Sequence, residues 1–407
     1  MPTPTLILFD DLVARTWEPF ALTRPAGELL FGVTTLRERI ERTFALKSSG
    51  YLVADHLQGF QEPGSPPILT SAAAATEGGD QLFLFTRFLP DWGAGPPRNL
   101  REGWLSTPEG TPVGWFSPSG AALPSPEFLL EPHTDGPRGG TLPGRVIENV
   151  WQLVVDNIDQ IGRDIRALFD RPRPAQLPGG SYLLGSGTLI VDPTAVIEPG
   201  TVFDASDGPI WIDRDVRVRA FTRLAGPAYI GQGSTILGGA LEAVSIGPVC
   251  RIRGEFAESV CAGYVNKQHD GHIGHAYLGR WVNLGAETTN SDLKNNYGSV
   301  RLWTPDRGEV DSGQVKMGSL IGDHVKTGIG TLLNTGTVVG AGSNIYGSQM
   351  PPCYVPPFSW GTGDNLVEFR LEKFLEVAER AMGRRKVTLS AGHRGQLVRA
   401  WEKSRRI

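Results

Sequence analysis

The segment Ile321–Ile345, IGDHVKTGIGTLLNTGTVVGAGSNI, repeats one pattern every six residues. The repeating positions are Ile321, Thr327, Leu333, Val339 and Ile345. A period of six differs from the 3.6 of an α-helix and the two of a β-strand, and it is typical of a β-helix. Three hexapeptides make one triangular turn, so residues 18 apart stack and the aliphatic side chains point inward.

Two earlier runs follow the same period. They are Ile190, Val196 and Val202, and then Ile212, Val218, Leu224, Ile230 and Ile236. Of the thirteen positions in the three runs, Thr327 is the one that is not aliphatic. The pattern resembles the left-handed parallel β-helix of hexapeptide-repeat acyltransferases, and we assign it to residues 181–362. The resemblance implies a homotrimer with ligand clefts between neighbouring chains.

The composition is that of a globular protein with excess glycine, 52 of 407 residues, against a usual share of about 7%. A net charge of −4 argues against nucleic acid or an anionic membrane surface as a partner. Cys250, Cys261 and Cys353 have neither metal-binding spacing nor a disulfide framework. The sequence predicts no signal peptide and no membrane span. We therefore expect a cytoplasmic protein that acts on small molecules.

Residues 1–180 show the alternation of an α/β domain. Short apolar runs predict buried strands, and charged segments with apolar residues four apart predict amphipathic helices. The expected strands are Leu6–Phe9, Tyr51–Ala54 and Leu82–Phe85, and the expected helices are Thr34–Phe44, capped by Thr34 or Thr35, and Val146–Phe169. This order favours a mainly parallel sheet. The interval 90–144 predicts no particular element.

The N-terminal part lacks the glycine-rich phosphate loops G-x-x-x-x-G-K-[ST] and G-x-G-x-x-G. It also lacks the GG-x-G-(T/S)-R and Pro-Lys elements of ordinary sugar-phosphate nucleotidyltransferases. The strings ILFDD and TRPAGELLFGVTTLRERIE nevertheless resemble the opening of a divergent sugar nucleotidyltransferase family that is fused to an acetyltransferase. The residues that carry this resemblance are Thr23, Arg24, Pro25, Glu28 and Gly32.

The resemblance implies that Arg24 binds nucleotide phosphate, since a guanidinium matches two phosphate oxygens. The alternative is an internal ion pair of Arg24 with Asp10 or Asp11, which follow the first strand. Nucleotidyl transfer would also need Mg²⁺ to neutralise the triphosphate, but the sequence does not identify its ligands.

A polar, histidine-rich segment interrupts the repeat: NKQHDGHIGHAYLGRWVNLGAETTNSDLKNNY, residues 266–297. Within it, Ile273 to Leu278 is a step of five and Leu278 to Leu284 a step of six. We expect this slip to mark the active site. The slip and the following VNLGA resemble the bifunctional N-acetylglucosamine-1-phosphate uridyltransferase and glucosamine-1-phosphate acetyltransferase. In that family the catalytic histidine lies fourteen residues before the asparagine of this motif, which selects His269 here, before Asn283.

The resemblance implies acetyl transfer from acetyl-CoA to the 2-amino group of glucosamine 1-phosphate, with His269 as the general base. It implies roles for seven further residues. Lys267, Asn283, Asn295 and Tyr297 would bind the sugar phosphate, and Ala286, Gly328 and Ser343 would line the acetyl-CoA groove. The N-terminal domain would transfer a nucleotidyl group, from UTP by resemblance, to the sugar 1-phosphate.

Three alternatives remain open from the sequence. The nucleotidyl reaction could use dTTP and glucose 1-phosphate, with a β-helix of other acyl specificity. A trimeric zinc lyase of the γ-carbonic-anhydrase kind would use His269, His272 and His275, although their spacing of three points them away from one shared metal. A non-catalytic scaffold is the third alternative.

The repeat ends after Trp360, and residues 363–407 are expected to form a helical cap. Apolar residues near helical spacing predict a helix over Asn365–Met382, with Asp364 as its N-cap. Such helices commonly cover the last open turn of a β-helix.

Overall fold

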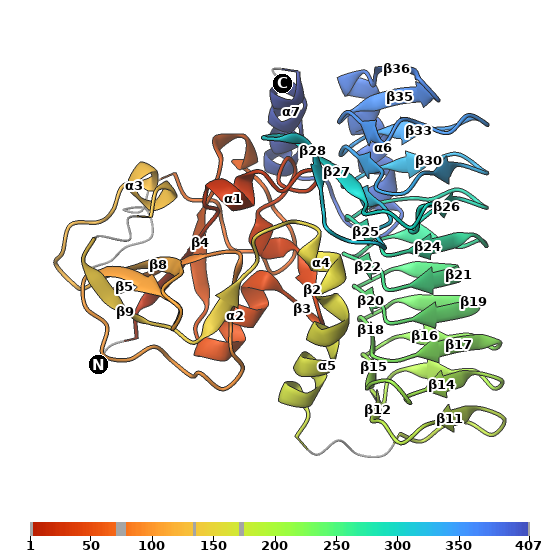
Figure 1. Ribbon diagram of the computed structural model, residues 1–407, viewed down its shortest axis with the longest axis horizontal. Helices are drawn as coiled ribbons and strands as arrows, with labels where there is room; N and C mark the ends of the chain where they lie inside the picture. Colours follow the sequence, from red (N-terminus) through yellow and green to blue (C-terminus); the bar gives the residue numbers. More distant parts are fainter. Residues whose placement is uncertain (1–2, 71–78, 133–135, 171–174, 406–407) are drawn as a thin grey trace.

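A computed structural model describes residues 3–70, 79–132, 136–170 and 175–405. An α/β domain lies beside one face of a tall β-helix, and two helices near the C-terminus lie at the far end of the β-helix (Figure 1). The predicted fold class is therefore confirmed. No helix among the described residues is long and apolar enough to cross a membrane.

The N-terminal sheet has the strand order β4-β1-β5-β8-β7-β9. Its strands are β4 (Ser48–Leu52), β1 (Thr5–Phe9), β5 (Gln81–Phe85), β8 (Pro112–Ser117), β7 (Gly103–Ser106) and β9 (Arg138–Thr141). Three of the five pairings are parallel, including those of β1 with β4 and β5, so the predicted, mainly parallel sheet is confirmed. The interval without a prediction supplies β7, β8, β9 and α3 (Pro126–Leu130).

The first long helix, α2 (Leu36–Phe44), begins where the sequence predicts. The Thr35 hydroxyl accepts a hydrogen bond from the Glu38 backbone N–H, and the Glu38 carboxylate accepts one from the Thr35 N–H. This reciprocal pair satisfies backbone donors that the first helical turn leaves free.

The second predicted helix starts later than expected. Residues Gly144–Val146 form β10, which pairs antiparallel with β6 (Phe88–Pro90). Because that ladder uses their backbone groups, the chain turns helical after them, as α4 (Gln152–Val155) and α5 (Asn157–Leu168). The prediction of one helix from Val146 is therefore wrong at its start.

The β-helix is a three-sided coil. Its inner face, against the N-terminal domain, consists of β12 (Leu189–Val191), β15 (Ile210–Ile212), β18 (Ala228–Ile230), β20 (Ser245–Ile246), β22 (Val260–Cys261), β25 (Tyr277–Leu278), β29 (Leu320–Ile321), β32 (Val338–Val339) and β34 (Tyr354–Val355). All of its pairings are parallel. The aliphatic residues of the second and third hexapeptide runs fill the interior, together with Thr327.

The second and third faces meet at an edge that we call the outer edge. The second face consists of β13 (Val196–Ile197), β16 (Arg217–Val218), the first parts of β19 (Thr235–Glu242) and β21 (Arg251–Ala257), β23 (Asn266–Lys267), β30 (Lys326–Thr327), β33 (Asn344–Ile345) and β35 (Ser359–Thr362). The third face consists of β11 (Tyr182–Leu184), β14 (Val202–Asp204), β17 (Thr222–Ala225), the second parts of β19 and β21, β24 (His272–Gly274), β26 (Thr289–Asn290) and β31 (Leu332–Leu333).

The five-residue step is not peculiar to the histidine-rich turn. Buried residues are also five apart in the two preceding turns, from Leu241 to Ile246 and from Phe256 to Cys261. Three successive turns therefore share the shorter corner between the third and inner faces. The expectation that the slip marks the active site alone is wrong, because the shorter corner is a property of the coil.

The predicted helix over Asn365–Met382 is also wrong at its start. Asn365–Glu368 form β36, antiparallel to β35, so Asp364 lies in a turn rather than at a helix cap. The helix α6 begins at Leu371 and ends at Gly383, and α7 follows at Ala391–Ser404. Phe358, Phe369 and Phe374 pack together under these helices and cover the end of the coil.

The two large units share one apolar core. Trp17 and Phe20 pack with Tyr277, Leu320 and other residues of the inner face. The rings of Phe20 and Tyr277 are 4.6 Å apart, and the Tyr277 hydroxyl donates to the Leu30 carbonyl at 3.1 Å. The N-terminal domain is therefore seated on the coil by side chains that neither unit could bury alone.

Four buried charges lie within this interface. Arg24, 2% exposed, donates to Asp323 of the coil at 2.7 Å and to both oxygens of Glu62 at 3.1 Å. Arg280 reaches Glu62 at 2.8 Å, and its backbone N–H donates to Asp323 at 2.7 Å. Burial opposes ionisation of Glu62, but the two arginines outweigh it and lower its pKa to about 2. The four charges therefore have all of their opposite partners only when both units are in place, and the buried Nε of Arg280 has no hydrogen-bond partner among the described residues.

Removing one member of this network should weaken the fold strongly. We expect Asp323→Ala to lower the free energy of unfolding by about 3–5 kcal/mol, because it leaves Arg24 as an underpaired buried charge. The control Glu376→Ala removes a surface partner of Lys373 and Arg380 and should cost about 0–1 kcal/mol. Urea unfolding measures both values, and equal losses would contradict the structural role of the network.

Candidate functional site

His269 lies at the outer edge of the coil, in the corner between β23 and β24. Its side chain is exposed. The preceding Lys267 is buried, and its ammonium donates to the backbone carbonyls of His269 and, at 2.6 Å, Asp270. Burial lowers the pKa of Lys267 to about 8. Lys267 thus holds the corner that contains His269. Its contact with a sugar phosphate stays a prediction, and such a contact would compete with these two hydrogen bonds.

Two predicted acetyl-CoA residues lie at the same edge, in the next turns. The Asp270 carbonyl accepts from the Glu287 N–H at 2.9 Å, and the Ala286 carbonyl accepts from the Gly330 N–H at 2.8 Å. These bonds stack the corners that contain His269, Ala286 and Gly328. A side chain at Gly328 would collide with Tyr346 of the next turn, so glycine is required there, and the acetyl-CoA roles of Ala286 and Gly328 stay predictions.

Asn283 lies on the second face, close to this corner. The Asn266 side chain donates to the Asn283 side-chain oxygen at 2.7 Å and accepts from Gln268 at 2.7 Å. Ser343 is less available, because its hydroxyl donates to the Pro356 carbonyl at 2.9 Å and accepts from the Ser359 N–H at 3.2 Å. The acetyl-CoA role of Ser343 stays a prediction without support from this geometry.

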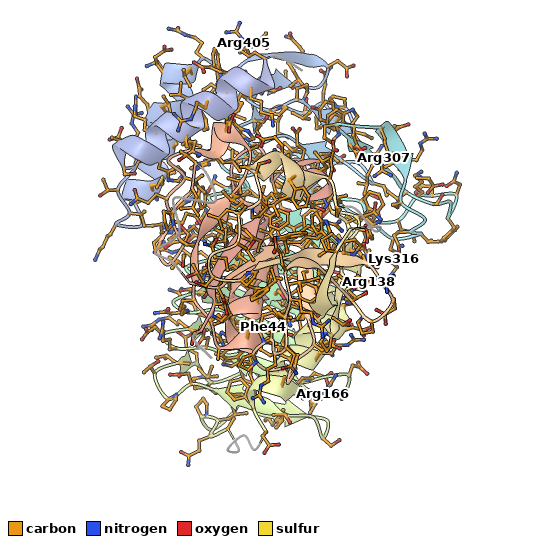
Figure 2. The ribbon with its side chains drawn as sticks, turned by 90° about the vertical axis from the view of Figure 1, so that its left-hand side faces the viewer. Phe44, Arg138, Arg166, Arg307, Lys316 and Arg405 are labelled. Carbon is orange, nitrogen blue, oxygen red and sulfur yellow. The ribbon has the colours of Figure 1, made fainter. Side chains whose placement is uncertain are left out.

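Asn295 and Tyr297 lie at a different edge. They belong to an insertion, residues 291–319, between the third and inner faces, which also holds the hairpin of β27 (Arg301–Thr304) and β28 (Gly308–Asp311). Figure 2 shows Arg307 and Lys316 of this insertion at one margin of the molecule. Asn295 lines a cavity of about 480 Å³, and Tyr297 is 71% exposed. Within one chain the third face separates both residues from the His269 corner.

The other two histidines of the segment form a cluster with carboxylates. His275 contacts Asp292 at 2.8 Å and Glu258 at 3.0 Å through its two ring nitrogens. His272 lies 3.8 Å from Asp292 and 3.5 Å from Glu255. Burial lowers the pKa of His275, but the hydrogen bonds to Asp292 and Glu258 outweigh it and raise that pKa to about 9. His275 therefore carries a proton near neutral pH and suits a structural or electrostatic role.

Sequence reasoning missed Asp292 and Glu258, although a signal was present. Glu258, His275 and Asp292 are each 17 residues apart, and 17 is the offset between paired residues of β21 and β24. Residues at that spacing stack on successive turns. Among the described residues, no group of three metal-ligating side chains is arranged to hold an ion.

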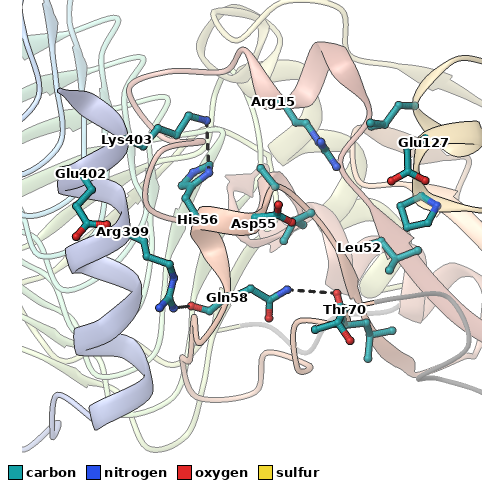
Figure 3. Close-up of a pocket in the computed structure, with 15 residues that line it drawn as sticks. Arg15, Leu52, Asp55, His56, Gln58, Thr70, Glu127, Arg399, Glu402 and Lys403 are labelled. Atoms are coloured by element: carbon teal, nitrogen blue, oxygen red, sulfur yellow. Dashed lines mark hydrogen bonds between the residues drawn. The ribbon is translucent and has the colours of Figure 1, made fainter. Parts of the chain in front are cut away.

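A cavity of about 740 Å³ opens beside the carboxyl end of β4 in the N-terminal domain. Its lining includes Arg15, Asp55 and His56, and α7 contributes Arg399, Glu402 and Lys403 (Figure 3). Burial and the nearby Lys403 lower the pKa of His56 to about 4, so its imidazole is neutral near pH 7. Ligands of open α/β sheets bind at this edge, so the cavity is the candidate nucleotide site.

Three N-terminal residues singled out by sequence lie in internal pairs instead. Asp10 is buried and accepts from Thr86 at 2.6 Å, and burial raises its pKa to about 6. Asp11 caps α1 (Leu12–Arg15) and pairs with Arg87 at 2.7 Å. Arg24 pairs with Glu62 and Asp323, as described above. The sequence also allowed an internal ion pair of Arg24, but with Asp10 or Asp11 as its partner. The predicted role of Arg24 in binding phosphate has no support in this geometry.

The protonated state of His275 makes a prediction about pH. The folded protein holds a proton that the unfolded chain releases above about pH 6.5, so this stabilisation is complete below that pH and is lost as pH rises through about 9. His275→Asn keeps a residue type that tolerates the local φ of +44° but cannot titrate. The difference in unfolding free energy between wild type and variant should shrink from pH 6.5 to 9.5, and a constant difference would contradict the assignment.

Comparisons with known proteins agree with this architecture. Residues 6–171 match the family described as sugar nucleotidyl transferase. A segment of 92 residues is 32% identical to a bifunctional sugar-1-phosphate nucleotidylyltransferase/acetyltransferase of Sulfurisphaera tokodaii. That alignment covers 23% of this chain, and the chain spans only 23% of the length of that relative.

Two solved structures from Bacillus cereus overlap about half of the chain. A mutant of the N-acyltransferase AntD, in complex with dTDP-4-amino-4,6-dideoxyglucose and coenzyme A, is 15% identical, with 50% of this chain and 92% of that chain covered and a TM-score of 0.23. The second structure is a gene product described as an acetyltransferase, and it is 10% identical. The overlap covers 54% of this chain and 98% of that chain, with a TM-score of 0.21. Overlaps with TM-scores this low do not bear on fold or function.

The family match covers the α/β unit, and the coil that follows it is a β-helix of the predicted kind. Residues 6–171 of this chain are similar to the sugar nucleotidyl transferase family, and a parallel β-helix follows them, as the predicted likeness to the fused nucleotidyltransferase/acetyltransferases implies.

Proposed function

We propose that this protein is a bifunctional transferase of amino-sugar metabolism. The β-helix would transfer an acetyl group from acetyl-CoA to the 2-amino group of glucosamine 1-phosphate. The N-terminal domain would transfer a nucleotidyl group from UTP to the sugar 1-phosphate. The observation that carries the first activity is the exposed His269 at a coil edge bordered by Ala286 and Gly328.

Acetyl transfer requires a base, because an amino sugar is largely protonated near neutral pH. The ammonium would first release one proton to solvent, and as the free amine attacks the thioester carbonyl the His269 imidazole would take a second proton from its nitrogen. The carbon–sulfur bond then breaks, and the leaving CoA thiolate takes the proton back from the imidazolium. The exposed position of His269 leaves its ring accessible to both substrates.

A site assembled from two chains would bring the separated residues together. Asn295 and Tyr297 lie at a different edge of the coil from His269, so a neighbouring chain in a trimer would supply them. A trimer places edges of adjacent coils in contact and encloses a cleft between them. This arrangement accounts for the exposure of both His269 and Tyr297 in a single chain.

Nucleotidyl transfer would take place in the cavity beside β4. An oxygen of the sugar phosphate attacks the α-phosphorus of the triphosphate, and pyrophosphate leaves. Arg15 and Lys403 line the cavity as cations for the phosphates, and Leu52 and Leu69 supply an apolar wall for a base. The Mg²⁺ implied by this chemistry does not fit Asp10 or Asp11, which are used internally, whereas Asp55 and Glu127 lie at the cavity.

A non-catalytic N-terminal domain is the second candidate. One observation favours it: Arg24, Asp10 and Asp11 all have internal partners. An assay that follows pyrophosphate release separately from CoA release decides between the two candidates, and substitution of dTTP for UTP tests the nucleotide.

Reciprocal variants should separate the two activities. His269→Ala removes the base and should lower CoA release by about 10²–10⁴-fold, with pyrophosphate release unchanged. Arg15→Ala should lower pyrophosphate release without changing CoA release. Each variant is the control for the other, because loss of both activities in either one would indicate misfolding. Full CoA release by His269→Ala would contradict the proposal.

The oligomeric state tests the shared site. Light scattering should give three times the chain mass of 44.0 kDa. Mixing inactive His269→Ala chains with inactive Tyr297→Ala chains, after partial unfolding and reassembly, should restore part of the CoA release, because some clefts receive both intact residues. A monomer with full activity would refute the two-chain site.

A further inference from the structure

A third cavity, of about 280 Å³, lies between the second face of the coil and α6. Its lining combines aromatic, amide and cationic side chains. They are Tyr264, Asn266, Trp281, Asn283, Lys326, Arg380, Arg384 and Arg385, together with Val282 and Ala381. Four of these residues are cations, and no carboxylate lines the cavity. The cavity is therefore positively charged in a chain whose net charge is −4.

The cations are poorly compensated. Among the described residues, neither Arg384 nor Arg385 has a carboxylate partner within ion-pair distance, and Arg380 pairs with Glu376 at 3.4 Å. The Arg385 Nε is buried, and no atom of the described residues accepts a hydrogen bond from it. Burial, followed by repulsion from Arg251 and Arg384, lowers the pKa of Arg385. A negative ligand would relieve this repulsion and accept the free donor.

The coil adds further donors to the cavity. Lys326 donates to the Trp281 carbonyl at 2.8 Å and the His324 carbonyl at 2.9 Å, which leaves one N–H of its ammonium unassigned. Burial lowers the pKa of Lys326 to about 7. The Trp281 indole N–H is buried without a partner, and its ring stacks on Tyr264 with centroids 4.1 Å apart. Charged donors thus surround a flat aromatic wall.

We propose that this cavity binds a phosphate group, with Arg384, Arg385 and Lys326 as its ligands. A guanidinium presents parallel donors that match phosphate oxygens. Asn283 lines the same cavity, and its bond to Asn266, which in turn accepts from Gln268, connects the cavity to the residue before His269. The turn that follows α6 therefore contributes two of the three proposed ligands, Arg384 and Arg385, while α6 itself covers the end of the coil.

Binding of a phosphate group at this cavity does not depend on the proposed function. The assignment of that phosphate to a substrate rests on the proposed function. Two substrates share this chemistry: the sugar 1-phosphate and the phosphates of coenzyme A. Two matched pairs of probes distinguish them. Glucosamine 1-phosphate is compared with glucosamine, and coenzyme A with pantetheine, which lacks the phosphates.

Titration calorimetry on the full chain tests the proposal with Arg384→Ala, an exposed residue whose truncation leaves the core intact. We expect the affinity for the phosphorylated member of one pair to fall about tenfold or more, which corresponds to about 1.4 kcal/mol, with its phosphate-free counterpart unchanged. The control Arg394→Ala removes an equally exposed arginine of α7 outside the cavity and should change neither.

Sulfate, which keeps its charge between pH 6 and 9, serves as a substrate-independent probe. Its affinity should fall as pH rises through about 7, since Lys326 loses its proton, and should fall with Arg384→Ala. If sulfate binds in this way while the wild type releases no CoA, the anion site stands and the acetyl-transfer proposal fails. If Arg384→Ala and Arg394→Ala affect every probe equally, the anion site is refuted.

Discussion

Stacking of successive turns is the constraint on which this structure depends. Each turn of the coil must return its chain to the same position, because the aliphatic side chains share one narrow interior. A residue is therefore placed by its distance along the chain, and the offset between stacked residues is 17 in the turns that hold Glu258, His275 and Asp292. This placement brings His269 beside Ala286 at one edge and stacks Glu258, His275 and Asp292 at another. A site built on such a frame needs few residues of its own to hold its geometry.

The N-terminal domain depends on the coil for the pairing of its buried charges. Arg24 lies in the loop whose sequence resembles that of nucleotidyltransferases. Its guanidinium nevertheless forms ion pairs with Asp323 of the coil and with Glu62. Burying four charges is tolerable because each has an opposite partner, and hydrogen bonds link Arg24 to Glu62 and Asp323. The two units are therefore coupled mechanically, even though their candidate sites lie on different sides of the molecule.

The C-terminal helices take part in both halves of the protein. α6 packs over the end of the coil, and Arg385 in the turn after it donates to the Asn266 side-chain oxygen at 3.2 Å. α7 reaches the N-terminal domain, where the Lys403 ammonium lies 3.4 Å from His56 Nδ1 in the lining of the candidate nucleotide cavity (Figure 3). Residues of α7 and Arg15 therefore line the same cavity, although they are almost 400 residues apart. The local sequence of either segment does not predict this contact.

The sequence by itself determined the coil, the α/β order of the N-terminal domain and the start of α2, because hydrophobic periodicity and helix capping act between residues close in the chain. The resemblance to known acetyltransferases selected His269 by its spacing from Asn283, and the catalytic role of His269 stays a prediction. The tertiary structure alone decided the partners of Arg24, the pairing of Asn365–Glu368 as a strand, and the cationic cavity beside α6. These features join residues far apart in the chain or use backbone groups of a neighbouring strand, and such contacts leave no periodic trace in the sequence.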